Sequence, residues 1–353
     1  MSILFAILLF SFLVFIHEFG HFVAAKLSGV QVNEFSIFMG PAIYQWERGE
    51  TTYSIRLIPL GGYCAMEGEN EDSDSPKSFL KAAWWKRLII LLAGSAMNFV
   101  TGVLLMCTVF ASYQTFITPE IASFDEGCTL NGEAGLQEGD RFLEVDGEKV
   151  YVYSDVSLVL SLNEGDVHDL VVERDGKKVY LDDFEMLKHE FPDGAGGTSL
   201  RYGFSFDTAE ATFGEKLKYA WNSSLNTVRT VRLSLQMLIT GQAGLKDMSG
   251  PVGIVQIMSE TAAASETTLD AVLNLLYFGG FIAINLAVMN LLPIPALDGG
   301  RVVGLLLTTG IEAVTKKKID SKYEAYIHGA GMVLLLVLMA VILFKDIFVI
   351  FKG

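Results

Sequence analysis

The sequence predicts a membrane α-helical bundle with four transmembrane helices, a membrane-associated β-hairpin loop and an inserted extracytoplasmic α+β domain. Three observations lead to this fold class. The chain has 353 residues, 51% of them hydrophobic, and a mean hydropathy of +0.40, which is high for a soluble protein. Four apolar stretches are long enough to cross a hydrocarbon core, which requires roughly 20 residues. The net charge of −15 is concentrated between the second and third stretches.

The apolar stretches set the expected order of segments along the chain. The first stretch has no Lys or Arg in its first sixteen residues and no small-x-small cleavage site, so we expect a transmembrane helix and not a signal peptide. The transmembrane segments are expected at residues 1–27, 86–112, 270–300 and 328–353. The segments between them are expected to be a β loop at 28–85, the inserted domain at 113–212, an amphipathic helix at 213–245, a connecting segment at 246–269 and a cytoplasmic loop at 301–327.

The charge distribution predicts a solvated domain and the orientation of the chain in the membrane. Residues 113–211 contain 22 acidic and 7 basic residues, whereas the rest of the chain is balanced, and nothing in this acidic segment suggests nucleic-acid binding. Basic residues in short loops mark the cytoplasmic side of a membrane. The acidic domain and both termini are therefore expected outside the cell. The basic residues that set this orientation are Lys77, Lys81, Lys86, Arg87, Arg301, Lys316, Lys317, Lys318 and Lys322.

Two segments show strand and turn chemistry. Residues 34–67 alternate in places and are interrupted by prolines and glycines, which favours a hairpin that dips toward the membrane. Within the acidic domain, a short strand followed by Asp146–Gly147 predicts a tight hairpin, in a run similar to the central signature of PDZ domains. Asp175–Gly176 predicts a second hairpin. The apolar periodicity of residues 213–240 predicts an amphipathic helix, either at the membrane surface or packed on the acidic domain.

The strongest chemical signal is the motif His17–Glu18–Phe19–Gly20–His21 inside the first span. On a helix, His17 and His21 project from one face and can bind one Zn²⁺, with Glu18 beside them. The alternative is two core histidines and an incidental Glu. That alternative is weak here, because an ionisable side chain at the centre of a membrane helix costs about 2.5–3.5 kcal/mol and three of them need a compensating partner.

A catalytic zinc usually has three protein ligands and an open position, so a third ligand is required. Asp298 is the best candidate, because it follows the proline-broken end of the third span and precedes two glycines. Asp-Gly is also common in ordinary helix-ending turns, which is the alternative for this residue. His168 and His189 lie in the predicted outer domain, and His328 opens the fourth span without polar neighbours. Three cysteines suggest neither a disulfide framework nor a metal site.

The chain resembles the site-2 protease family, in particular its bacterial members with one PDZ domain. Five motifs in the family's order carry the resemblance: HEFGH at residues 17–21, IPLGGY at 58–63, the PDZ-like segment at 134–147, SGPVGI at 249–254 and NLLPIPALDGG at 290–300. The resemblance implies that His17, His21 and Asp298 bind zinc and that Glu18 is the catalytic base. It also implies a substrate-holding amide at Asn290. The strand segment at residues 51–66, with Gly61 and Gly62, is expected to bind an unwound stretch of substrate as an added β-strand.

The expected activity is zinc-dependent hydrolysis of peptide bonds in or near transmembrane helices of single-span proteins, such as anti-sigma factors or signal-peptide remnants. The expected partners are these substrates and the lipid bilayer, and the oligomeric state is not predicted. One rival is a membrane-anchored zinc protease with a downstream Glu ligand, for which Glu312 and Glu324 are available. Others are a catalytically silent membrane chaperone and a transporter, although no internal repeat supports the latter.

Overall fold

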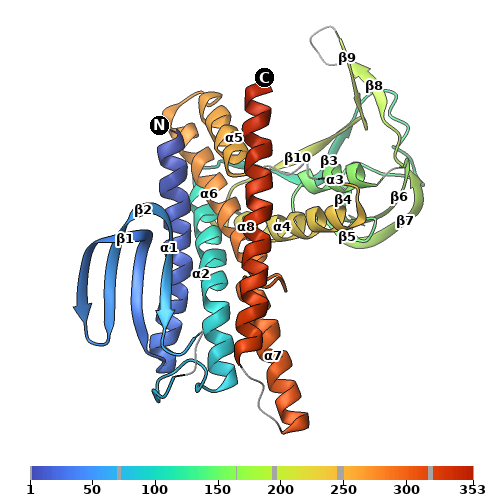
Figure 1. The fold of residues 1–353 in the computed structure, drawn as a ribbon. Helices are drawn as coiled ribbons and strands as arrows, with labels where there is room; N and C mark the ends of the chain where they lie inside the picture. The colour runs from blue at the N-terminus through green and yellow to red at the C-terminus, as the bar shows by residue number, and fades with distance from the viewer. Residues whose placement is uncertain are drawn as a thin grey trace. The chain divides into compact units, whose positions relative to one another are not determined.

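The computed structural model describes residues 2–69, 73–163, 165–192, 197–244, 250–316 and 321–352 (Figure 1). Ser249 of the SGPVGI motif and the basic residues Lys317 and Lys318 lie outside the described residues. The chain divides into two compact units, which are described separately. The first comprises Met1–Leu105 and Thr227–Gly353, and the second comprises Met106–Asn226.

Four long apolar helices agree with the four predicted spans. They are α1 (Ser2–Ser28), α2 (Trp84–Phe110), α6 (Thr268–Asn290) and α8 (Ser321–Lys352). Each contains a stretch long and apolar enough to cross a membrane. In Figure 1, α1 begins and α8 ends at the same end of the helical bundle, as an even number of crossings requires.

Glycines bring the membrane helices close together. A Cβ atom added at Gly20 of α1 would lie 2.5 Å from the carbonyl oxygen of Ala93 in α2. One added at Gly102 of α2 would lie 2.5 Å from Ile284 Cγ1 in α6. Small residues at helix interfaces let membrane helices approach closely where no hydrophobic driving force exists between them. The sequence therefore sets two close crossings, α1 with α2 and α2 with α6.

The predicted hairpin is formed by β1 (Val32–Arg48) and β2 (Thr51–Met66), each of which bends so that the pair makes a wider sheet. Ile37 of β1 is paired with Ile55 on one side and with Gly62 on the other. The C-terminal part of β2 is consequently an edge of the sheet, and Figure 1 shows the sheet beside α1. Ser11 Oγ of α1 donates a hydrogen bond of 2.7 Å to the carbonyl oxygen of Pro59, which fixes β2 to α1.

The described part of the second unit is mainly an antiparallel β structure, with the short helix α3 packed in its core. Asp146–Gly147 and Asp175–Gly176 form the two expected turns, with all four residues at positive φ as a type I′ hairpin turn requires. Helix α3 packs Val156, Val159 and Leu160 into the core of this unit. The sheet order is β10-β3-β4-β6-β7, with β5 paired to β4 and β8 paired to β9. The elements are β3 (Thr115–Phe124), β4 (Arg141–Val145), β5 (Glu148–Lys149), α3 (Ser154–Leu162), β6 (Val167–Arg174), β7 (Lys177–Glu185), β8 (His189–Pro192), β9 (Thr198–Arg201) and β10 (Phe204–Glu210).

Three further helices lie between or after the apolar spans, one where the sequence predicts a helix and two where it predicts a connection or a loop. Helix α4 (Phe213–Thr240) is the predicted amphipathic helix, and its N-terminal half packs within the second unit, where Tyr219 stacks on Phe116 at 4.3 Å. The segment expected to be a simple connection contains α5 (Pro251–Ala263), and the segment expected to be a loop after the third span contains α7 (Asp298–Thr315). Helix α5 starts with Pro251 at its first turn, a position that proline favours because its missing N–H needs no partner there.

Candidate metal centre

His17 and His21 lie one turn apart on α1 and point to one place. Their Nε2 atoms are 3.2 Å apart, and their side chains are only 12% and 9% exposed. The helix continues through both residues without interruption because the run from Ser2 to Ser28 contains no proline and only one glycine. The spacing of four residues therefore produces the convergence that the sequence predicts.

Asp298 reaches the same place from the first turn of α7. Its Oδ2 atom lies 3.1 Å from His17 Nε2 and 3.3 Å from His21 Nε2. The two glycines that follow it permit this position. A Cβ atom at Gly299 would lie 2.2 Å from the carbonyl oxygen of Leu291, and one at Gly300 would lie 2.3 Å from that of Ile294. The start of α7 is therefore pressed against the backbone that leaves α6.

The three donor atoms fit a zinc ion. Ligand atoms about 2.0–2.1 Å from a tetrahedral Zn²⁺ lie about 3.3–3.4 Å from one another, which is close to the three observed separations of 3.1, 3.2 and 3.3 Å. Asp298 Oδ2 is also buried without a hydrogen-bond partner among the described residues. A cation between these atoms would satisfy that oxygen. Two imidazoles and one carboxylate are a donor set typical of a catalytic zinc site with an open position.

Residues of α2 orient the two imidazoles, and sequence reasoning missed them. His21 Nδ1 lies 2.8 Å from the carbonyl oxygen of Ile90, so Nδ1 carries the proton and Nε2 is free to bind a metal. The Asn98 side chain lies 3.5 Å from His17 Nδ1. A Cβ atom at Gly94 would lie 2.4 Å from His21 Nε2. The available signal was Gly94 and Asn98, spaced four residues apart in the second span, where Asn98 is the one residue with an amide side chain.

Glu18 and Asn290 lie beside the three candidate ligands. Glu18 follows His17 on α1 and interacts electrostatically with both histidines and with Asp298. Asn290 is the last residue of α6, and its Nδ2 atom is 3.5 Å from His17 Nε2. A potential proton acceptor and an amide therefore border the site.

Gly61 and Gly62 carry the edge of the β sheet past Glu18. Gly61 has φ of 80°, a conformation that side chains disfavour. A Cβ atom at Gly62 would lie 2.9 Å from the carbonyl oxygen of Ser36 and 3.7 Å from Glu18 Cγ. Glycine at both positions thus keeps the strand edge close to the metal centre. All seven site residues that the sequence predicts lie in this region.

The residues considered as alternative ligands lie elsewhere or have other contacts. Within the described part of the chain, the cluster of metal-ligating side chains consists of His17, His21 and Asp298. Glu312 is a half-buried residue near the C-terminal end of α7, far in sequence from the first turn that carries Asp298, and the Glu324 side chain lies outside the described residues. In the second unit, His168 Nδ1 contacts Asp146 Oδ2 at 2.7 Å.

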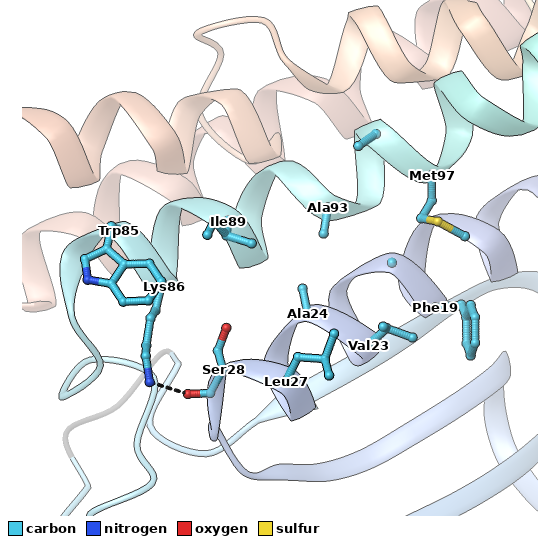
Figure 2. A pocket seen from close by; sticks show the side chains of 12 residues that line it. Phe19, Val23, Ala24, Leu27, Ser28, Trp85, Lys86, Ile89, Ala93 and Met97 are labelled. Carbon is cyan, nitrogen blue, oxygen red and sulfur yellow. Dashed lines mark hydrogen bonds between the residues drawn. The ribbon is translucent and has the colours of Figure 1, made fainter.

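A separate apolar pocket lies between α1 and α2, with a volume of about 470 Å³. Figure 2 shows Val23 and Leu27 of α1 on one side of the pocket and Ile89 and Ala93 of α2 on the other, with the Lys86 amine bonded to the Ser28 carbonyl oxygen. Phe19 and Val23 each follow a candidate histidine ligand by two residues, which is about 200° around a helix. The pocket is therefore on a different face of α1 from the metal centre.

Comparisons with known proteins agree with this geometry. The model of peptidase family M50 matches residues 5–338. A Clostridium acetobutylicum protein named as a zinc metalloprotease is 36% identical over 98% of this chain and 97% of its own length. A protein of the same description from Clostridium perfringens is 34% identical over 98% of both chains. The regulator of sigma-W protease RasP of Bacillus subtilis is 28% identical over 97% of both chains. The chain therefore belongs to peptidase family M50, the site-2 protease family, and is a zinc metallopeptidase with several membrane helices.

Proposed function

We propose that this chain is an intramembrane endopeptidase that cuts peptide bonds in or near the transmembrane helices of single-span proteins. The observation that carries the proposal is the convergence of His17, His21 and Asp298, from two distant helices, within a helical bundle apolar enough for a membrane. His17, His21 and Asp298 are the proposed zinc ligands. A bound Zn²⁺ supplies Lewis acidity that activates water and polarises the scissile carbonyl.

The chain's own residues supply the proton transfers and hold the substrate. Glu18 takes the proton of the attacking water and passes it to the leaving amine, so no nucleophilic side chain is needed. The substrate must unwind locally, because the hydrogen bonds of a helix shield its peptide bonds. The edge of β2 at Gly62 offers backbone groups to the unwound segment as an added strand. Asn290, whose Nδ2 atom lies 3.5 Å from His17 Nε2, donates to the substrate backbone as well.

The proposal also covers the orientation of the chain in the membrane and the role of the second unit. Lys77, Lys81, Lys86 and Arg87 favour a cytoplasmic position for the start of α2, and we propose that the metal centre lies near that side of the membrane. Both termini and the second unit then lie outside. Its two Asp-Gly hairpins and the packing of α3 in its core support a PDZ-like domain, which docks substrates or excludes large ones. The similarity to a regulator of sigma-W protease favours signalling proteins, such as membrane-bound anti-sigma factors, as substrates.

The proposal is tested with purified full-length protein in lipid nanodiscs and a fluorescent reporter that contains one transmembrane helix. We expect cleavage within the helix, loss of cleavage with a chelator, and recovery with added Zn²⁺. Cleavage that resists the chelator while zinc is lost would contradict a metal-dependent reaction. Cleavage only in the soluble part of the reporter would contradict intramembrane proteolysis.

Replacement of Asp298 with Asn is expected to lower zinc affinity by roughly 10-fold or more, because an amide oxygen carries no negative charge for the cation. Zinc content per chain, measured by plasma mass spectrometry after dialysis, checks this result. The matched control is Asp270→Asn in the first turn of α6, where Asp270 caps its own helix through Thr267. Full zinc occupancy in Asp298→Asn would remove Asp298 from the ligand set.

Substrate unwinding predicts that helix stability, more than side-chain identity, sets the cleavage rate. Each glycine placed in the reporter helix near the cut weakens it by about 1 kcal/mol relative to alanine, so the rate is expected to rise up to about fivefold for each glycine. The same glycines placed two turns away serve as the control and should change the rate little. Equal rates for the Ala and Gly reporters would contradict the unwinding step.

A further inference from the structure

Helix α8 contacts the loop that carries Asp298 through a histidine that the proposed mechanism does not use. Ala296, two residues before Asp298, donates its backbone N–H to His328 Nδ1 at 3.0 Å. His328 is half-buried near the start of the membrane-spanning part of α8. Because Nδ1 accepts this bond, the imidazole is neutral and carries its proton on Nε2.

Ala296 needs this support because of its backbone conformation. Its φ is 81°, in the left-handed region that residues with a Cβ atom disfavour. Such a conformation persists only where surrounding contacts enforce it. The hydrogen bond that Ala296 donates to His328 is a contact of this kind. Ala296 itself lies in the short loop between α6 and α7, after two prolines and just before the first turn of α7.

Gly331 adds a second contact from the same face of α8, since it lies three residues after His328. A Cβ atom at Gly331 would lie 2.5 Å from Pro295 Cβ, 2.6 Å from the Pro295 carbonyl oxygen and 2.7 Å from its carbonyl carbon. Most of these neighbours are backbone atoms, which cannot move without moving the loop. A Cβ atom at Gly329, two residues earlier, would meet nothing within 4 Å.

The loop is also held on the other side of Asp298. Arg301, three residues after Asp298, pairs with Glu69, which follows β2. Asp298 therefore lies between a contact to α8 and a contact to the β1–β2 region. Its Oδ2 atom must stay within about 0.5 Å of its productive position to serve a preorganised site.

We propose that His328 and Gly331 are positioning residues that set the Asp298 carboxylate against His17 and His21. The proposal rests on the proposed role of Asp298 as the third zinc ligand. His328 acts through the backbone of Ala296 and touches neither the metal nor the substrate. Gly331 keeps α8 close enough for that hydrogen bond to form.

The hydrogen bond is tested with two substitutions at His328 in full-length protein. Phe keeps the ring volume and removes the acceptor, whereas Asn places an amide oxygen near the position of Nδ1. We expect His328→Phe to weaken zinc binding by about 10-fold or more, in the range seen when outer partners of metal ligands are removed. We expect His328→Asn to recover most of the affinity. Zinc affinity is measured by competition with a chromophoric chelator, and kcat and KM are measured with the transmembrane reporter.

The close approach of α8 is tested with the pair Gly331→Ala and Gly329→Ala. Both place the same methyl group on the same helix, but only the first meets the loop. Gly331→Ala should weaken zinc binding and lower kcat while KM stays within about twofold, and it should change the visible spectrum of the Co²⁺-substituted protein. Gly329→Ala should match the wild type. If His328→Phe does not fold, the two glycine variants alone test whether α8 positions Asp298.

Three results would overturn the proposal. One is unchanged zinc affinity and kcat in both His328→Phe and Gly331→Ala. Another is an equal loss in His328→Asn and His328→Phe, because packing alone would then explain the effect. The third is an equal loss in Gly329→Ala and Gly331→Ala. The Asp298→Asn variant tests the ligand role of Asp298 separately from the positioning role of His328 and Gly331. If Asp298→Asn loses zinc and the α8 variants do not, only the positioning role is refuted.

Discussion

Replacement of Glu18 with Gln is expected to abolish cleavage of a transmembrane reporter while about one zinc ion per chain remains bound. Gln has nearly the same shape as Glu but cannot accept a proton from water at neutral pH. General-base catalysis contributes about 10²–10⁴-fold to a rate, so the residual rate should fall by at least that amount. Initial rates in nanodiscs and zinc content by mass spectrometry, measured on the same preparation, check the result.

The control for this variant is Glu312→Gln, which changes a half-buried Glu near the C-terminal end of α7. Glu312 is also an available third ligand in the rival account of a membrane-anchored zinc protease. We expect unchanged rates and zinc content in Glu312→Gln. Retained cleavage in Glu18→Gln would refute the role of Glu18, and zinc loss in Glu312→Gln would favour the rival account.

Gly94→Ala is expected to remove zinc and cleavage together. The added methyl group would lie 2.4 Å from His21 Nε2 and 2.7 Å from His17 Cε1, so both imidazoles must move. His21 has little freedom to move because its Nδ1 atom is held by the Ile90 carbonyl oxygen at 2.8 Å. Displaced ligands should lower zinc affinity by about 100-fold, the upper end of the effect of disturbed ligand orientation. Chelator competition on the purified variant measures this loss.

The matched control is Gly102→Ala on the same helix. Its methyl group would be equally crowded, at 2.5 Å from Ile284 Cγ1 and 2.9 Å from the Gly280 carbonyl oxygen, but it faces α6 and not the histidines. We expect lower thermal stability for Gly102→Ala and unchanged zinc affinity in the folded fraction. Equal zinc loss in the two variants would show that general loosening of the bundle, and not contact with the imidazoles, is responsible.

The elements that could be predicted from the sequence depend on local patterns. The spacing of His17 and His21 places both side chains on one helix face whatever the rest of the chain does. The two Asp-Gly pairs determine tight hairpins in the same way. Asp298 was found by a different argument, since a zinc site needs a third ligand and few ionisable residues lie at the ends of apolar spans.

The elements that were missed depend on which helix faces meet. Gly94, Asn98 and the Ile90 carbonyl group act on the histidines only because α1 and α2 cross at that point, and the periodicity of one helix does not identify its partner. His328 lacked polar neighbours in sequence, and its partner Ala296 offers only a backbone N–H. Backbone groups carry no residue-type signal, so contacts of this kind become visible only in three dimensions.

Zinc K-edge X-ray absorption on the purified full-length protein reports the atoms bound to the metal, and it therefore distinguishes a site built from His17, His21 and Asp298 from any other. We expect nitrogen and oxygen ligands at about 2.0–2.1 Å, with the outer-shell signal of two imidazoles. We also expect this pattern to be altered in Asp298→Asn. A sulfur shell at about 2.3 Å, or an imidazole signal that survives in a His17→Ala and His21→Ala double variant, would contradict a zinc site built from the first membrane helix and Asp298.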